Sequence, residues 1–256
     1  MSLSLASATF LFSVGILGGV MNAVAGGGTF FVFPALLFTG VPPVPANATN
    51  TVALWPGLAA SVRAFWPRLN VTRRLLVPLL VTSLLGGVAG AVLLIRTPAD
   101  IFMRLVPWLL LAATVLFAIG PRLGRGAASQ NALEASAGKI ALATLVELIV
   151  AVYGGYFGGG IGIVILAMLG ALGMSDIHDM NALKIILTAL INGVAVVTFI
   201  VARAVYWPQA LVILVGAVLG GYFGAHYSQR LPAAWVRGFV LLVGAGMTTY
   251  FFLRHS

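Results

Sequence analysis

Long hydrophobic runs separated by short polar connections make up almost the whole chain. Eight runs approach the ~20 residues that an α-helix needs to cross a bilayer. Two further runs, 28–39 and 160–173, are too short for an ordinary span. The pattern therefore predicts an all-α polytopic membrane protein. The eight long runs are 5–24, 47–66, 75–95, 101–120, 138–157, 181–202, 208–226 and 233–253.

Each short run begins at a triplet of glycines. Glycines 26–28 introduce the first short run, and glycines 158–160 introduce the second. Three glycines form a poor helix interior, so each triplet predicts a broken helix. Lipid cannot satisfy the backbone groups that a break frees, so a break persists where protein, a ligand or a water-filled cavity supplies partners. Close helix packing at small residues is the alternative explanation.

The sequence also repeats itself once. Asn47-Ala48 aligns with Asn181-Ala182 at a shift of 134 residues, and the same shift places Gly86 on Gly220. The glycine triplets align at a shift of 132 residues, from 26 to 158, so a small indel separates the two features. We therefore predict two homologous four-helix halves with glycine-broken first helices. Their predicted bounds are 1–121 and 138–256, joined by a polar linker at 122–137.

Such duplicated breaks are typical of secondary transporters, whose binding sites lie near the bilayer midplane at the interface of the repeats. A helix that starts at a break directs its N–H groups and positive dipole end at the site, which suits an anion. We expect inverted repeats, with parallel repeats as the alternative. Arginines concentrate in loop 63–74 and in the linker, so both are predicted to be cytoplasmic.

Composition narrows the classes of protein. Hydrophobic residues make up 61% of the chain and charged residues 7%, against about 25% charged in soluble domains. A soluble enzyme and a nucleic-acid-binding domain are therefore excluded, and the net charge of +9 is attributed to membrane orientation. There is no cysteine, the three histidines are scattered, and no HExxH or GxSxG motif occurs. We expect no enzyme activity, no metal and no cofactor.

Two stretches carry a family resemblance. The first contains Asn22-Ala-Val-Ala-Gly-Gly-Gly-Thr29, followed by Asn47-Ala-Thr-Asn50-Thr51. The second contains Gly154-Gly-Tyr-Phe-Gly-Gly-Gly-Ile-Gly and then Asn181-Ala-Leu-Lys184. Both resemble the sulfite exporter TauE/SafE family of membrane permeases. The resemblance implies export of a sulfur-containing anion across the inner cell membrane, with sulfite as the first candidate. Thiosulfate, sulfoacetate and other organic or sulfur oxyanions are the alternatives, as is an anion channel.

Polar residues of run 181–202 recur at positions that share one helix face. Within this stripe, Lys184 is predicted to offer a positive charge to the anion. Snorkelling to the headgroups, or an ion pair with Asp176 or Asp179, is the alternative. The first-half counterpart of Lys184 is Asn50, with Thr51 beside it. For Asn47, which is also among the predicted site residues, a helix cap is the default interpretation. The stripe consists of Asn181, Lys184, Thr188 and Asn192.

Glu147 is the one carboxylate inside a long hydrophobic run. An ionisable group at such a position is a functional hypothesis by default, because a membrane interior penalises charge. A carboxyl group there prefers its neutral form, so Glu147 is predicted to couple transport to protons. A structural glutamate, protonated or paired with an arginine, is the alternative.

The predicted partners are a small anionic substrate and the lipid bilayer, without nucleic acid; the oligomeric state stays open. The substrate site is expected between the two halves. The residues predicted to line it are Asn22, Gly26, Gly27, Gly28, Thr29, Asn47, Asn50, Thr51, Gly158, Gly159, Gly160, Asn181, Lys184 and Asn192.

Overall fold

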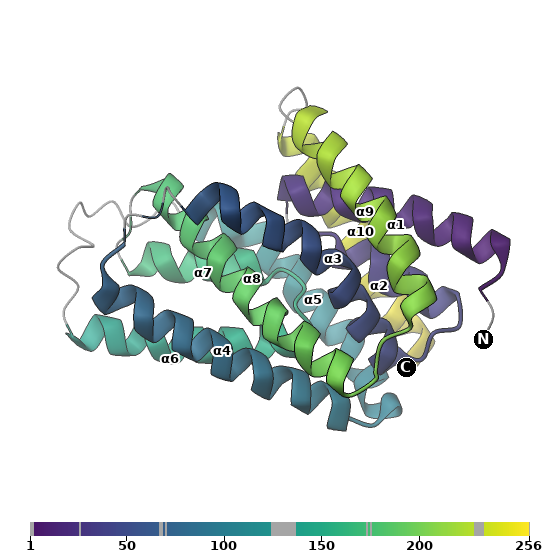
Figure 1. Cartoon of the computed structure of the whole chain (residues 1–256), viewed down its shortest axis with the longest axis horizontal. Coiled ribbons are helices and arrows are strands. Elements are labelled where there is room, and N and C mark those ends of the chain that lie inside the picture. The colour runs from purple at the N-terminus through teal and green to yellow at the C-terminus, as the bar shows by residue number, and fades with distance from the viewer. Residues whose placement is uncertain are drawn as a thin grey trace. The chain divides into compact units, whose positions relative to one another are not determined.

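In the computed structural model, all regular structure among the described residues is α-helical (Figure 1). The structure describes residues 3–25, 27–66, 69, 71–123, 137–172, 174, 176–227 and 233–255. Most of the predicted linker, 124–136, lies outside them. The helices are α1 Leu5–Ala25, α2 Thr29–Phe38, α3 Pro43–Phe65, α4 Arg73–Arg96, α5 Ala99–Leu123, α6 Ala137–Tyr156, α7 Ile161–Ala171, α8 Ile177–Val201, α9 Trp207–Tyr227 and α10 Ala233–His255.

Six of these helices are long and apolar enough to cross a membrane, judged over the described residues. They are α1, α4, α5, α6, α8 and α9, so the all-α polytopic architecture is confirmed. The sequence predicted eight spans. The helix α3 opens with the polar stretch Pro43–Thr51, which lowers its mean hydropathy, and α10 is apolar over the shorter stretch Gly238–Leu253.

Both predicted helix breaks are present. The helix α1 ends at Ala25 and the short α2 starts at Thr29; α6 ends at Tyr156 and the short α7 starts at Ile161. The short helices have 10 and 11 residues, which at ~1.5 Å per residue is about half of a ~30 Å hydrocarbon core. The breaks therefore create two additional helix N-termini, each a few residues after the C-terminal end of a long helix.

The first compact unit comprises Met1–Gly57, Leu94–Thr114 and Phe199–Ser256. Within it α1 crosses α9, and the two helices pack along each other (Figure 1). The approach depends on glycine: a Cβ added to Gly15 would lie 2.7 Å from the carbonyl oxygen of Ile213. Small residues allow this backbone approach, which strengthens van der Waals packing between membrane helices.

The second compact unit comprises Leu58–Leu93 and Val115–Thr198. Here α4 packs against α6 in the same way: a Cβ added to Gly86 would lie 2.8 Å from the carbonyl oxygen of Leu148. Farther along, Gly90 meets the backbone of Val152. A hydrophobic core from α4, α6, α7 and α8 fills the unit.

The two pairings are equivalent in the predicted repeat. By the sequence alignment, α1 corresponds to α6 and α9 corresponds to α4, so each unit pairs a first helix with a late helix of the other half. Gly220 of α9, the counterpart of Gly86, meets the backbone of Ile16 in α1. Each compact unit therefore combines helices from both predicted halves, and α9 and α4 are the exchanged helices.

Candidate functional site

The first break is a close crossing of backbone. Gly28 precedes α2 with an ordinary helical φ of −57°, so its conformation does not require glycine. A Cβ added to Gly28 would instead lie 2.6 Å from the carbonyl oxygen of Gly18 and 3.2 Å from Cβ of Asn22. Gly27 donates a long backbone hydrogen bond to Met21 at 3.4 Å. Among the described residues, glycine serves close packing at this break; Gly26 lies outside them.

Asn50 of α3 reaches the start of α2. Its Nδ2 donates to Oγ1 of Thr29, the first residue of α2, at 3.4 Å. Asn50 is 1% exposed, and its Oδ1 has no hydrogen-bond partner among the described residues. A buried amide oxygen without a partner carries a desolvation cost, so this position can still accept a hydrogen bond.

Asn47 and Thr51 lie one turn apart in the same helix. Thr51 Oγ1 donates to the backbone oxygen of Asn47 at 3.0 Å. The default interpretation that Asn47 caps its helix is wrong, because α3 starts a turn earlier, at Pro43. Proline is well suited to a first helical position, since its missing N–H would have no partner there. Asn47 and Thr51 are both buried.

The neighbouring Thr49 has a tertiary partner that the sequence did not reveal. Its Oγ1 accepts a hydrogen bond from the backbone N–H of Tyr206 at 3.0 Å. This bond ties the polar start of α3 to the segment before α9 in the same compact unit. The bond gives a partner to the backbone N–H of Tyr206, which lies directly before α9.

Glycine has a different role at the second break. Gly158 and Gly160 have φ of +77° and +74°, a left-handed conformation that costs other residues roughly 1–2 kcal/mol. Tyr153 Oη donates to the carbonyl oxygen of Gly159 at 2.7 Å. The break is therefore held by backbone conformation and by an aromatic hydroxyl one turn back in α6. The sequence did not predict the bond from Tyr153 to Gly159, because tyrosines of membrane helices lie more often at the membrane–water interface.

The polar stripe of α8 lies beside this second break. Lys184 Nζ donates to Asn181 Oδ1 at 3.1 Å. A Cβ added to Gly162, in the first turn of α7, would lie 3.3 Å from Cδ of Lys184. At Gly158 an added Cβ would lie 3.5 Å from Asn192 Oδ1. Thr188 is the fourth residue of the stripe. Its backbone oxygen accepts a hydrogen bond from Asn192 Nδ2 at 2.9 Å.

Asp176 has a structural role before α8. Its Oδ1 accepts the backbone N–H groups of His178 at 2.7 Å and Asp179 at 3.1 Å. These two bonds stabilise the carboxylate and hold the pKa of Asp176 below its usual value. The hydrogen bond recorded for Lys184 Nζ goes to Asn181, so the predicted alternative of a Lys184–Asp176 ion pair is wrong.

Glu147 is fully buried at the contact between α6 and α4. Its side chain is 0% exposed, and Ser83 Oγ donates to its Oε1 at 2.6 Å. Its Oε2 has no hydrogen-bond partner among the described residues. The alternative of an arginine partner is therefore wrong. Ser83 was missed because it lies 64 residues away in sequence.

The predicted site residues thus form one cluster in each compact unit. Asn22, Gly27, Gly28, Thr29, Asn47, Asn50 and Thr51 belong to the first, and Gly158, Gly159, Gly160, Asn181, Lys184 and Asn192 to the second. Equivalent positions make equivalent contacts: Asn50 reaches the first turn of α2, and Lys184 reaches the first turn of α7.

The second cluster brings a lysine side chain and a helix N-terminus together. The helix α7 has no acidic residue in its first turn, so the positive end of its dipole is not compensated by its own side chains. The ammonium group of Lys184 lies on a side chain that packs against that same turn. Among the described residues, no group of three His, Cys, Asp or Glu could hold a metal ion.

Known proteins resemble the chain over most of its length. The family model described as Sulfite exporter TauE/SafE matches residues 11–251. "Probable membrane transporter protein" of Haemophilus influenzae is 29% identical over 216 residues, covering 84% of this chain and 82% of that protein. "Probable membrane transporter protein ORF9" of Sinorhizobium sp is 28% identical over 219 residues, covering 86% and 82%. "Probable membrane transporter protein YfcA" of Escherichia coli K12 is 26% identical over 215 residues, covering 84% and 78%. No solved structure matches.

The left-handed backbone at the second break gives a stability test. We expect Gly158→Ala to lower the free energy of unfolding by roughly 1–2 kcal/mol, and Gly158→Asn to lower it less, because asparagine tolerates this conformation better. Thermal unfolding in detergent measures both. Gly246→Ala, at a position with no atom within 4 Å of an added Cβ, is the control and is expected to keep full stability. Equal losses for Ala and Asn would contradict the conformational role.

Proposed function

The chain belongs to the sulfite exporter TauE/SafE family, and on that basis we propose that it exports a small sulfur-containing anion across the inner cell membrane. It is a multi-pass membrane protein, and the names of its family and relatives describe transport rather than catalysis. Sulfite is the first candidate substrate. The observation that carries the proposal is the meeting of Lys184 with the first turn of α7 beside a break in the membrane helix.

Lys184 acts as the charged contact for the anion. An anion that leaves water loses its hydration, and a cation in a low-dielectric environment replaces part of that stabilisation. In the structure, Asn181 Oδ1 accepts the hydrogen bond of the ammonium group. An arriving sulfite oxygen would accept a hydrogen bond from the same ammonium group, and two ionised partners attract each other more strongly than an ammonium group and a neutral amide do.

Asn50 acts as the neutral counterpart in the first cluster. It holds the first residue of α2 through Thr29 and keeps one N–H of its amide for a ligand. Donors without charge bind an anion more weakly than an ammonium group does. A single full charge assisted by neutral donors lets a divalent anion bind and still be released.

Glu147 couples export to protons in this proposal. A carboxyl group that is fully buried between two packed helices changes its charge at a large energetic cost. Its one partner among the described residues is the Ser83 hydroxyl, which can stabilise either protonation state by donating to Oε1. A proton taken up or released at Glu147 therefore changes the charge of the contact between α4 and α6.

Flux measurements test the substrate. In proteoliposomes with and without a pH gradient, we expect sulfite to move faster than through empty liposomes, with saturable kinetics. Thiosulfate, sulfoacetate, sulfate and taurine are the comparison solutes. If neither sulfite nor any comparison solute moves faster than through empty liposomes, the substrate assignment is contradicted. Flux that does not saturate would favour the channel alternative.

Substitution of the two equivalent contacts tests their roles. Lys184→Ala is expected to raise the half-saturating anion concentration about 10-fold or more, on the scale of a charge-assisted hydrogen bond of ~1.5–3 kcal/mol. Asn50→Ala is expected to raise it less, near the ~0.5–1.5 kcal/mol of a neutral bond. Lys139→Ala, at the other lysine of the chain, is the matched control. Lower stability of Lys184→Ala with an unchanged half-saturating concentration would reject Lys184 as a ligand.

The proton coupling has its own test. Glu147→Gln keeps the shape and the acceptor oxygen for Ser83 but cannot titrate, so we expect it to flatten the pH dependence of sulfite flux. Ser83→Ala removes the partner and is expected to shift that dependence rather than abolish it. Asp100→Asn, an exposed carboxylate on α5, is the control. A pH dependence that survives in Glu147→Gln would exclude Glu147 from the coupling.

A further inference from the structure

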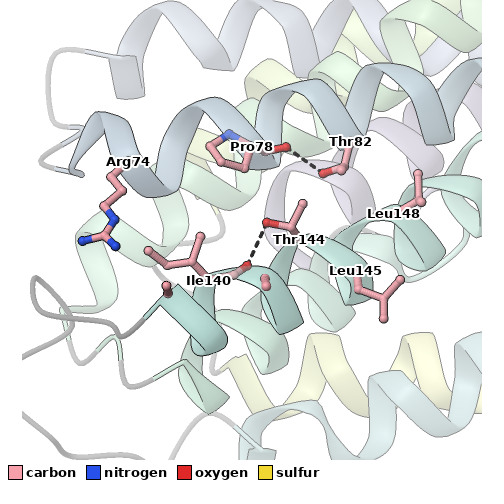
Figure 2. Close-up of a pocket in the computed structure, with 9 residues that line it drawn as sticks. Arg74, Pro78, Thr82, Ile140, Thr144, Leu145 and Leu148 are labelled. Carbon is pink, nitrogen blue, oxygen red and sulfur yellow. Dashed lines mark hydrogen bonds between the residues drawn. The ribbon is translucent and has the colours of Figure 1, made fainter.

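We propose that the groove between the N-terminal parts of α4 and α6 binds an anionic phospholipid, with one acyl chain in the groove and the phosphate at Arg74. The groove has a volume of about 500 Å³, within the ~300–1,000 Å³ typical of small-molecule sites. Figure 2 shows Pro78 and Thr82 of α4 on one side, α6 on the other, and Arg74 at one end.

The walls of the groove are chemically apolar. Its two threonine hydroxyls are turned onto their own helices: Thr82 Oγ1 donates to the carbonyl oxygen of Pro78 at 2.9 Å, and Thr144 Oγ1 donates to that of Ile140 at 2.8 Å. Both bonds are visible in Figure 2. With these groups satisfied, the surface offers methyl and methylene groups, which suit a hydrocarbon chain.

The length of the groove matches one leaflet of a bilayer. On α6 its lining runs from Ala137 to Leu148, about 16 Å at ~1.5 Å per residue. One leaflet contributes about half of a ~30 Å hydrocarbon core. The groove ends where Gly86 brings α4 onto the backbone of Leu148. A chain lying in it would therefore start at the membrane surface and stop near the midplane.

The open end of the groove gathers positive charge. The helix α4 begins with Arg73 and Arg74, α6 has Lys139 in its first turn, and neither first turn contains an acidic residue. The positive end of a helix dipole repels cations at the helix N-terminus, and neighbouring cations there also repel one another. Among the described residues, the structure records no ion pair for these three side chains. A phosphate at Arg74 would relieve the repulsion.

An anionic phospholipid fits both the apolar walls of the groove and the positive charge at its open end. The same end of the groove belongs to the arginine-rich segment predicted to be cytoplasmic, where anionic headgroups attract basic residues. The inner end of the groove lies at the level of the buried pair described above, since Thr82 and Leu148 directly precede and follow Ser83 and Glu147 in sequence.

Lipid association in vesicles tests the proposal without any transport measurement. The purified protein is placed in phosphatidylcholine vesicles, and the binding of spin-labelled phosphatidylglycerol is compared with that of spin-labelled phosphatidylcholine with the same chains. We expect a preference for phosphatidylglycerol that Arg74→Gln lowers about five-fold. Ala141→Phe, which fills the groove without changing charge, should lower it as well. Arg96→Gln, at the other end of α4, is the matched control and should leave it unchanged.

Several outcomes would overturn the proposal. These are equal binding of the two lipids by the parent protein, an equal loss in Arg96→Gln, and a preference that survives in Ala141→Phe. A preference that appears only at high protein density would assign this face to a second copy of the chain. Thermal unfolding of each variant confirms that a lost preference does not come from a lost fold.

Discussion

A helix break leaves backbone polar groups without their helical partners, and the two breaks of this chain are accommodated in different ways. At the first break, backbone crosses backbone so closely that a Cβ on Gly28 would meet the carbonyl oxygen of Gly18. At the second, two glycines adopt left-handed angles and the Tyr153 hydroxyl binds a carbonyl oxygen of the turn. In both places a short helix starts with its first turn beside a polar side chain of the following helix. The candidate site exists only because the folded protein stabilises these two breaks, which bring each short helix beside that polar side chain.

Sequence patterns predicted the breaks and the residues beside them because their physical cause is local. Three adjacent glycines disfavour a helix wherever they stand, and a repeat at a fixed shift identifies Asn50 and Lys184 as counterparts. The partners Ser83 and Tyr206 could not be predicted in this way, since each bond depends on the rotation and depth of a second helix or segment. The start of α3 was placed a turn late because its prolines look like a loop but also suit a first helical turn.

The two halves of the repeat differ most in their ionisable groups. Lys184 and Glu147 both lie in the second half, and the alignment places Asn50 and Gly15 at their counterparts in the first. Where Gly15 allows α1 to approach the backbone of α9, Glu147 instead binds Ser83 at the contact of α6 with α4. The two copies thus share the contacts between first and late helices, while the ionisable side chains Lys184 and Glu147 have uncharged counterparts.

The exchange of helices between the halves has a consequence for biosynthesis. The partner of α1 is α9, and Trp207 follows Ala25 by 182 positions in the chain. At ~5–20 residues per second, a ribosome needs roughly 10–40 s to deliver the second helix after the first. The contact of α4 with α6 closes much sooner, because these helices are nearly adjacent in the chain. The nascent protein therefore assembles its middle before its ends, and the glycine face of α1 stays open in the membrane until translation is almost complete.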